Sequence, residues 1–371
     1  MGRKILIPYL SAGLGHLTMA QAIACSLKDM RPDWVVRLMD PAKELHDAMM
    51  QRTFIDLWRV ILSLPGPLQN ALFGLERLFP RATRAVNRSR FRTAVPKAAA
   101  LLAADPPDLI VSTHWACTHL FSMARGDRRI PLYYIYGELQ ETYSIARCGA
   151  DRYFTFSAKV GGDLARMGVD PATIQQIPVI VDPAMVWNDT PREVLRRGLG
   201  IPPESLAVVL SLGGEGIGRT IPFIEAFARE AKGATLVVLT GRNTALLDRI
   251  RRRVTSPSVI ALGYQEDLSG IVASADVLAG KSGTGFAMMA IATGIPLIVT
   301  HLGAPNEAGN MRHIVENGHG WYCPRPQMFT RKVAELVKGH SCSTDSPGAA
   351  GRVAVQNGAE TIAAAIVDAL S

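Results

Sequence analysis

The chain has 371 residues, of which 48% are hydrophobic and 19% are charged, and its formal net charge is +8. This length allows two domains with sizeable cores, and the composition excludes a mainly disordered chain. No run of 18 uncharged apolar residues predicts a membrane span. The five cysteines form no C-x-x-C pair and are odd in number, which argues against a zinc or disulfide framework and favours a reducing compartment. We therefore expect a cytoplasmic protein.

Short apolar segments alternate with helical patterns along the chain. The first half predicts a helix over 13–30 and strands at 4–10, 34–40, 107–114, 131–138 and 151–157. The second half predicts strands that run into turns at 206–218, 235–243, 258–264, 276–283 and 296–303, and an amphipathic helix over 359–370. Strands separated by helices indicate parallel βαβ units, so the predicted class is α/β with doubly wound sheets.

A proline-rich, polar stretch at 183–206 interrupts this alternation and reads as a linker. It predicts two Rossmann-like domains, an N-terminal one at 1–182 and a C-terminal one at 207–352. The last segment, 353–371, ends in the apolar helix, which we expect to pack back on the first domain.

Ligands of open α/β sheets bind beyond the carboxyl ends of the strands, so the residues after the predicted strands are the candidates for a site. Four such segments carry glycines or polar side chains: GGEGIG at 213–218, TGRN at 240–243, GKSG at 280–283 and PNEAGN at 305–310. Glycines there allow the backbone to approach an anion, and a following helix offers free N–H groups. Taken alone, each segment is equally typical of a plain turn.

The GKSG segment can be compared with a triphosphate-binding loop, which needs the pattern G-x-x-x-x-G-K-[ST]. Gly280, Lys281 and Ser282 supply the second half of that pattern, but Ala275 stands where the first glycine belongs. The spacing therefore argues against a P-loop. It leaves a nucleotide-sugar loop, or a loop that has lost its ligand.

The four segments in this order resemble the carboxyl-terminal domain of family 28 glycosyltransferases. The resemblance is greatest to the monogalactosyldiacylglycerol synthase and processive diacylglycerol glycosyltransferase branch, whose motifs run approximately GGGEGMG, CGRN, KAGxxTxxEA and PGQExGN. It is strong over residues 205–335 and weaker over 1–180. In the first domain, Gly13-Leu14-Gly15-His16 is similar to the GGGH turn of that family, and PDLIVSTH at 107–114 to its PDLIVSxH strand.

This resemblance implies a GT-B fold, in which two Rossmann-like domains face each other across a cleft. The second domain would bind a nucleotide sugar, with a UDP-linked hexose as the implied donor, and the first a lipid acceptor. Enzymes of this type invert the anomeric centre without a bound metal or permanent cofactor, and no D-x-D pair suited to a cation is present. The implied donor-binding residues are Gly214, Glu215, Gly216, Gly218, Gly241, Arg242, Asn243, Gly280, Lys281, Ser282, Gly283, Thr284, Gly285, Met289, Asn306, Glu307 and Asn310.

Direct displacement needs a base for the acceptor hydroxyl, and two residues of the first domain compete for that role. His16 follows the glycine turn after the first strand, although a helix-capping histidine is an alternative for it. Glu138 ends the strand 131–138, where the family usually has the Asp of a Thr-Asp pair. His114, together with Gly13 and Gly15, is a candidate for acceptor binding, and a buried, hydrogen-bonded histidine is an equal alternative for His114.

One residue of the GKSG segment departs from the family pattern. The family Thr falls at Phe286 and its Glu at Met289. That Glu accepts hydrogen bonds from the nucleotide ribose, which a thioether does only weakly. Either Glu307 or Asn310 replaces it, or donor binding differs in this protein.

The segment 51–100 is strongly basic, with nine Arg or Lys against two acids. Helical spacing places Phe54, Leu57, Trp58, Ile61 and Leu62 on one face, and Leu68, Leu72, Leu75 and Phe79 on another. One interpretation is two core helices with a solvated charged face. The other is an anionic membrane surface bound by residues 51–97, which the resemblance favours. Nucleic acid is disfavoured because no recognition motif accompanies the charge.

These patterns together predict a peripheral membrane enzyme that moves a hexose from a nucleotide sugar to a lipid such as diacylglycerol. The nearest alternative is a glycosyltransferase with a polyprenyl-linked or soluble secondary-metabolite acceptor. A non-catalytic GT-B nucleotide-binding protein is the alternative from another functional class.

Overall fold

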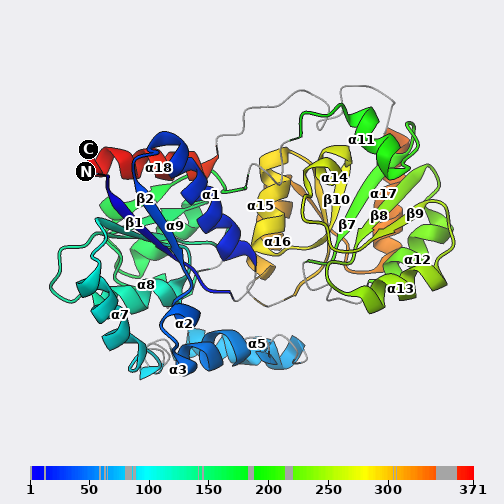
Figure 1. Ribbon diagram of the computed structural model, residues 1–371. Coiled ribbons are helices and arrows are strands. Elements are labelled where there is room, and N and C mark those ends of the chain that lie inside the picture. Colours follow the sequence, from blue (N-terminus) through cyan, green and yellow to red (C-terminus); the bar gives the residue numbers. More distant parts are fainter. Residues whose placement is uncertain are drawn as a thin grey trace. The chain divides into compact units, whose positions relative to one another are not determined.

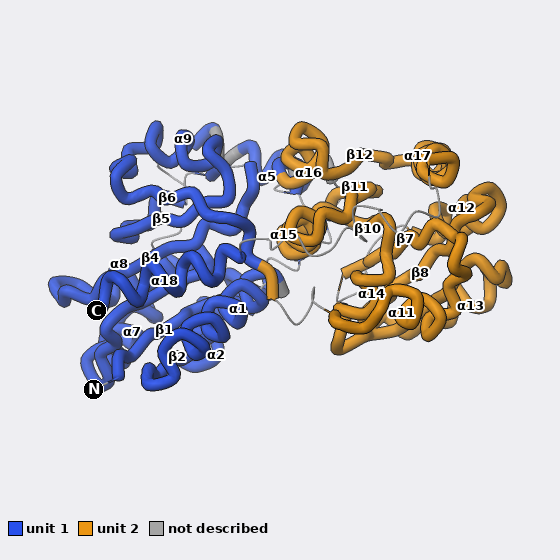
Figure 2. The backbone as a smooth tube through the Cα atoms, turned by 90° about the horizontal axis from the view of Figure 1, so that it is seen from above, with its two compact units in different colours: residues 1–180, 304–309, 356–371 blue, residues 181–303, 310–355 orange. Residues whose placement is uncertain are grey.

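We describe a computed structural model of the chain. It covers residues 2–11, 14–57, 60–61, 64, 66–79, 86, 89–140, 142–143, 146–182, 188–213, 220–303, 305, 307–339 and 357–371. Two compact units divide the chain (Figure 2), and each is described by itself. Unit 1 comprises 1–180, 304–309 and 356–371, and unit 2 comprises 181–303 and 310–355.

Unit 1 is built around a six-stranded parallel sheet with the strand order β2-β1-β3-β4-β5-β6 (Figure 1). Its strands are β1 (Lys4–Pro8), β2 (Val35–Met39), β3 (Leu109–Ser112), β4 (Leu132–Ile135), β5 (Arg152–Thr155) and β6 (Ile174–Gln176). Its α-helices are α1 (Leu14–Met30), α2 (Pro41–Glu44), α3 (Ala48–Met50), α5 (Gly66–Leu78), α7 (Ala94–Ala104), α8 (Trp115–Ala124), α9 (Ala158–Arg166) and α18 (Gly358–Leu370), with a π-helical turn at Gln51–Asp56 and a 3₁₀ turn at Pro171–Thr173.

Helices cover both faces of this sheet. Leu6, Ile110 and Leu132 belong to one core cluster with buried residues of α7 and α8. Because side chains alternate along a strand, Ile5 and Ile7 point to the opposite face, where α1 packs beside α18. Burial on both faces explains why the strands appear in the sequence as continuous apolar runs.

Unit 2 contains a second six-stranded parallel sheet, with the order β12-β11-β10-β7-β8-β9. Its strands are β7 (Leu206–Ser211), β8 (Ala234–Leu239), β9 (Val259–Leu262), β10 (Val277–Lys281), β11 (Leu297–His301) and β12 (Gly320–Tyr322). Its helices are α11 (Arg192–Leu199), α12 (Ile221–Glu230), α13 (Thr244–Arg253), α14 (Ser269–Ser274), α15 (Thr284–Thr293), α16 (Glu307–Glu316), which begins at the boundary with unit 1, and α17 (Pro326–Gly339). Phe227 and Phe329 of α12 and α17 pack on one face of the sheet. The prediction of two doubly wound α/β domains is confirmed.

The C-terminal helix α18 is anchored in unit 1 through backbone contacts. The side chain of Asn357 accepts a hydrogen bond from the N–H of Ala359 at 3.1 Å, and the N–H of Gly358 donates to the carbonyl of Val179 at 3.0 Å. A Cβ on Gly358 would lie 2.1 Å from the carbonyl oxygen of Pro178. Only glycine therefore allows this approach of the helix to the chain at 178–179.

The predicted linker 183–206 is only partly a linker, because α11 lies within it. Arg192 and Arg196 of this helix each donate to a different oxygen of Asp276, both at 2.5 Å, and Asp276 also accepts from the N–H of Ala207 at 2.7 Å. Asp276 is 5% exposed. A buried carboxylate thus fixes α11 to the amino ends of β7 and β10, so this part of the range belongs to unit 2.

The predicted helical face of Phe54, Leu57 and Ile61 is also corrected. Phe54 and its neighbour Ile55 are buried, whereas Leu57 is 41% exposed. Residues 51–56 form a π-helical turn. Its i→i+5 hydrogen bonds give more residues per turn than the 3.6 of an α-helix, so the predicted residues do not share one face. Trp58, Leu62 and the side chain of Leu75 lie outside the described residues.

Candidate functional site

The strand order of unit 2 reverses between β7 and β10, and open α/β sheets bind ligands at such a point. Gly213 follows β7 there with a left-handed φ of +72°, and Lys281 ends β10. A Cβ on Gly213 would lie 3.5 Å from Cε of Lys281. The lysine side chain therefore runs along the glycine turn, which brings together two segments that the sequence proposed separately.

Gly280 shapes this corner. Its φ of +150° favours glycine, and a Cβ would lie 2.4 Å from the carbonyl oxygen of Ser211 on β7. The pairing of β10 with β11 shifts register between Gly280 and Lys281. The irregularity turns the end of β10 where the lysine projects.

Asn310 of α16 braces the loop that follows Lys281. Its side-chain amide donates to the carbonyl of Ser282 at 3.1 Å and to Oγ1 of Thr284 at 3.2 Å, and both Asn310 and Ser282 are fully buried. Gly283 precedes the first turn of α15. The loop is thus held in place at a helix N-terminus, where N–H groups attract an anion.

The TGRN segment after β8 divides into two roles. Asn243 caps α13 by accepting from the N–H of Leu246 at 2.9 Å. Arg242 follows Gly241, whose φ is +58°, and its guanidinium lies 4.5 Å from the ring centre of Tyr264. Tyr264 is 50% exposed. This pair offers a flat, cationic surface at the carboxyl ends of β8 and β9.

The structure places the remaining predicted donor residues, and the acceptor candidates Gly13 and Gly15, in different ways. Glu307 begins α16 and is buried, Met289 of α15 is also buried, and Gly285 is exposed in the first turn of α15. Gly15 is half-buried in α1. Six candidates lie outside the described residues: Gly13, Gly214, Glu215, Gly216, Gly218 and Asn306.

The strand order of unit 1 reverses between β1 and β3, and His16 lies at that point. Its Nδ1 is 2.6 Å from the carbonyl oxygen of Thr113, and Oγ1 of Thr113 donates to the carbonyl of His16 at 3.0 Å. A carbonyl only accepts, so Nδ1 carries the proton and Nε2 has the lone pair. Burial lowers the pKa of His16, although the Thr113 carbonyl opposes this. A neutral imidazole with an unprotonated Nε2 is suited to act as a base.

His114, not His16, is the capping histidine. Its Nδ1 accepts from the N–H of Ala116 at 3.1 Å at the start of α8, and only 7% of the residue is exposed. Burial, with the nearby His16 as a smaller cause, holds the pKa of His114 well below its ordinary value. The two rings meet edge to face at 4.6 Å. Of the two interpretations of His114, acceptor binding or a buried and hydrogen-bonded histidine, the structure fits the second.

The turn after β4 brings Glu138 into the same region. A Cβ on Gly137 would lie 3.7 Å from Cε1 of His16 and 3.2 Å from Cε of Met19. Glu138 is half-buried. Both candidate bases therefore belong to the carboxyl edge of the sheet of unit 1.

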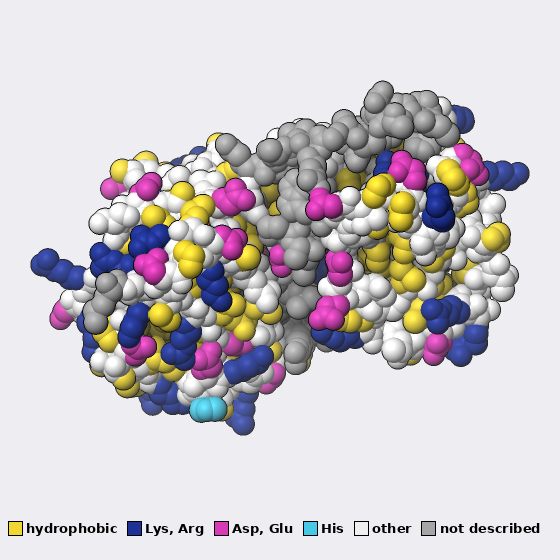
Figure 3. Space-filling model, turned by 45° about the horizontal axis from the view of Figure 1, so that its top comes forward, with side chains coloured by type: hydrophobic (Ala, Val, Ile, Leu, Met, Phe, Trp, Pro, Cys, Tyr) yellow, Lys and Arg dark blue, Asp and Glu magenta, His cyan; other side chains and the backbone are white. Residues whose placement is uncertain are grey.

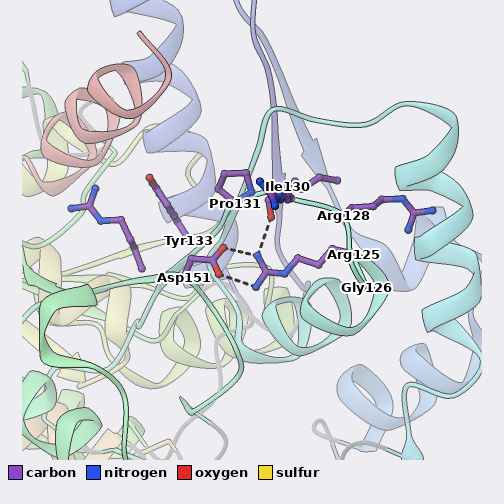
Figure 4. Close-up of a pocket in the computed structure, with 9 residues that line it drawn as sticks. Arg125, Gly126, Arg128, Ile130, Pro131, Tyr133 and Asp151 are labelled. Atoms are coloured by element: carbon purple, nitrogen blue, oxygen red, sulfur yellow. Dashed lines mark hydrogen bonds and ion pairs between the residues drawn. The ribbon is translucent and has the colours of Figure 1, made fainter.

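A hollow of about 570 Å³ lies at the opposite, amino edge of this sheet (Figure 4). It is lined by four arginines and by Asp151, but Arg125 is bound to Asp151 at 2.5 and 2.9 Å and to the carbonyl of Ile130 at 2.9 Å. Arg128 points away from this clamp (Figure 4). We assign Arg125 and Asp151 a structural role, which is to join α8 to β4 and β5.

Comparison with known proteins shows a similarity to glycosyltransferases. A family model described as glycosyl transferases group 1 matches residues 218–339. The chloroplastic monogalactosyldiacylglycerol synthase of Spinacia oleracea is 24% identical over 90% of the chain, and the probable one of Glycine max is 27% identical over 90%. The chain spans 66% and 65% of the lengths of these two proteins, which is less than two thirds.

Solved structures share the fold over nearly the whole chain. Anabaena HepE in complex with UDP-glucose has a TM-score of 0.59 at 15% identity and covers 99% of this chain and 100% of its own. The calicheamicin glycosyltransferase CalG4 has a TM-score of 0.63 at 15% identity, with 99% and 98% covered. A putative UDP-N-acetylglucosamine 2-epimerase from Listeria monocytogenes has a TM-score of 0.63 at 13% identity, and the match covers 100% of this chain and 96% of the epimerase. These structures and this chain share the GT-B fold of two Rossmann-like domains.

Two positions at the carboxyl edge of the sheet of unit 2 were not among the predicted site residues. Tyr264 follows a strand directly, as the other candidates do, so the same rule would have found it. His301 ends β11 and pairs in register with Lys281 at the carboxyl edge of the sheet. Its Nδ1 is 3.0 Å from Oγ1 of Thr300.

Two further findings concern metals and membranes. Among the residues that the structure describes, no group of three or more His, Cys, Asp or Glu is suited to a metal ion. Within the same residues, no helix is long and apolar enough to cross a bilayer. Metal independence stays a prediction.

Replacing Lys281 with methionine tests the prediction that its ammonium group contacts the donor diphosphate. We expect the affinity for UDP to fall roughly 10- to 150-fold, since hydrogen bonds to charged groups contribute about 1.5–3 kcal/mol. Calorimetry with UDP and with uridine measures this. Uridine has no diphosphate, so its affinity should not change; an equal loss for both ligands would contradict the assignment.

Proposed function

We propose that the protein transfers a hexose from a UDP-sugar to a hydroxyl of a lipid acceptor such as diacylglycerol. The observation that carries this proposal is the glycine–lysine corner at the β7–β10 switch point of a glycosyltransferase domain. The sequence relation to monogalactosyldiacylglycerol synthases over nine tenths of the chain supports the lipid acceptor. HepE, a structural neighbour, is described with UDP-glucose bound, which supports the donor.

The donor would lie at the carboxyl edge of the sheet of unit 2. Lys281 and the N-terminus of α15 favour the negative charge of the diphosphate. The Arg242–Tyr264 pair offers a surface on which the uracil ring of the donor would stack. These groups would stabilise the diphosphate as it leaves, and such electrostatic stabilisation often lowers the barrier more than any other effect.

The chemistry is a single displacement. The oxygen of the acceptor hydroxyl forms the new bond to C1 of the sugar, and its proton passes to Nε2 of His16. The bond between C1 and the diphosphate oxygen breaks, and its electron pair leaves with UDP. Attack from the side opposite to the leaving group inverts C1. The hydrogen bond from Nδ1 to Thr113 keeps the imidazole in the tautomer that this step needs.

The lipid acceptor requires a membrane contact, for which the segment 51–97 is the candidate. Large apolar side chains are exposed along it: Leu57, Val60, Leu68, Leu72, Leu78, Phe79 and Val86. The basic excess of 51–100, nine against two, suits anionic headgroups. By contrast, Figure 3 shows a face on which Lys and Arg alternate with Asp and Glu. We therefore propose peripheral association through this segment.

A donor panel tests the proposed function. The protein is incubated with UDP-glucose, UDP-galactose or UDP-N-acetylglucosamine and with diacylglycerol vesicles, and products are identified by mass spectrometry. We expect a glycosyl-diacylglycerol of inverted configuration, formed equally with EDTA. Transfer only to polyprenyl-linked or soluble acceptors would contradict the proposed lipid acceptor. UDP binding without turnover would favour a non-catalytic protein.

Restoring the family acid at Met289 tests the departure in the donor loop. We expect Met289→Glu to raise the affinity for UDP several-fold, because a carboxylate accepts hydrogen bonds from the ribose and a thioether does so only weakly. Affinity for 2′-deoxy-UDP should rise less. Met289→Gln is the matched neutral control, because Met289 is only 7% exposed and a buried charge has its own cost. No gain for UDP would mean that loss of a ribose acceptor is not the explanation.

A further inference from the structure

We propose that the contact between Phe73 of α5 and Tyr143 makes transfer depend on docking of α5 to an anionic lipid surface. The inference rests on the proposed function and deepens it. It names the element through which the membrane acts on the acceptor site.

Helix α5 presents an apolar stripe to the exterior. Leu68 and Leu72 of α5 are four residues apart and are 49% and 39% exposed, and Phe79, which directly follows the helix, is 59% exposed. The spacing of four places Leu68 and Leu72 on one side of the helix. Isolated exposed leucines are common, but a stripe within a segment of nine basic and two acidic residues matches the surface of an anionic bilayer.

Phe73 points away from this stripe. It follows Leu72 by one residue and so lies roughly 100° around the helix. Its ring meets the ring of Tyr143 at 5.8 Å with an interplanar angle of 67°, an edge-to-face contact. Phe73 is half-buried and Tyr143 is 8% exposed. One helix therefore has a lipid-facing side and a side that touches the body of unit 1.

Tyr143 is joined by a hydrogen bond to the turn at the acceptor site. Its N–H donates to the hydroxyl of Tyr136 at 3.4 Å, and Tyr136 directly precedes Gly137 and Glu138. Helix α9 holds the end of this turn, where Ser157 donates to the carbonyl of Leu139 at 2.6 Å and Lys159 donates to the carbonyl of Gln140 at 3.0 Å.

The start of the turn lies against the proposed base. Gly137 has so little space beside Cε1 of His16 and Cε of Met19 that a Cβ there would already contact both. A shift of this turn would therefore push the backbone of Gly137 against the imidazole of His16. When the stripe of α5 is seated in a bilayer, Phe73 is held against Tyr143 and the turn is fixed beside His16.

Phe73→Ala in the full chain separates this role from membrane contact. Flotation with vesicles of phosphatidylcholine and phosphatidylglycerol should be unchanged. The kcat for vesicle-borne diacylglycerol should fall about three- to tenfold, the size of an aromatic pair contact, with an unchanged KM for the UDP-sugar. Phe73→Tyr keeps the ring and should restore the rate. The double variant Leu68→Ser, Leu72→Ser should instead reduce flotation.

A second readout does not need turnover. Hydrogen exchange of residues 137–143 should slow when anionic vesicles are added to the wild type, and should not slow in Phe73→Ala. If the wild type transfers to no acceptor, the proposed function fails, but exchange still decides the coupling. Vesicle protection of 137–143 in Phe73→Ala equal to wild type would overturn the inference. So would equal losses of rate with vesicle-borne and micellar short-chain diacylglycerol.

Discussion

Replacing His16 with asparagine is expected to lower kcat for sugar transfer by about 10²- to 10⁴-fold, the usual contribution of a positioned base. The asparagine amide can stand near the place of Nδ1 and still donate to the Thr113 carbonyl, so the fold should be retained. Steady-state kinetics with UDP-sugar and diacylglycerol vesicles measures the loss. Thermal unfolding confirms that the variant is folded.

His114→Asn is the matched control. Asparagine is a good N-cap and can accept from the N–H of Ala116 as Nδ1 of His114 does. This variant should lose no more than a few-fold in rate. If it loses more than His16→Asn, the roles of the two histidines are reversed, and equal losses would contradict the assignment of His16 alone as the base. If Glu138→Gln is the more damaging change, Glu138 is the base.

The pH dependence of the wild type follows from the same base. Burial lowers the pKa of His16 below its ordinary 6.5, so the imidazole stays neutral until the pH falls below that value. The acid limb of kcat/KM should therefore lie below pH 6.5, and the rate should fall as pH drops through it. The limb should be absent from the residual rate of His16→Asn. An acid limb above 6.5 would contradict the assignment.

Asp276→Asn is expected to destabilise unit 2 by about 3–5 kcal/mol, because it leaves two guanidinium groups near each other without their buried anion. Arg196 is 9% and Asp276 5% exposed, so water does not replace the lost partner. Calorimetric unfolding measures the change. The transition of unit 2 is expected to be the one whose midpoint temperature rises when UDP is added.

Glu225→Gln is the control for that experiment, since it removes a carboxylate of the same unit from a pair with Arg253 at 3.7 Å. Both members of this pair are largely exposed, at 38% and 60%. Its loss should cost less than about 1 kcal/mol. Equal effects of the two substitutions would mean that the Asp276 cluster does not fix α11.

The fold could be predicted in most of its parts because buried parallel strands leave a plain signal. Each predicted strand overlaps an observed one, and the helices at 13–30 and 359–370 are α1 and α18. Two strands were missed, β6 and β12. Each has three residues at the edge of a sheet, which is too short to show a pattern. Helix α11 was missed because its charged residues read as a polar linker, whereas their partner lies 80 residues away.

The sequence by itself determined the α/β class, the order of the glycine-rich turns and the resemblance to lipid glycosyltransferases, because these depend on local pattern and spacing. It left His16 and His114 with overlapping roles. Only the tertiary structure shows that His114 caps α8 and that Nδ1 of His16 faces a carbonyl, since the tautomer and pKa of an imidazole depend on what surrounds it. The carbonyl that orients His16 is 97 residues away, and Lys281 meets Gly213 only because β7 and β10 are neighbours in the sheet.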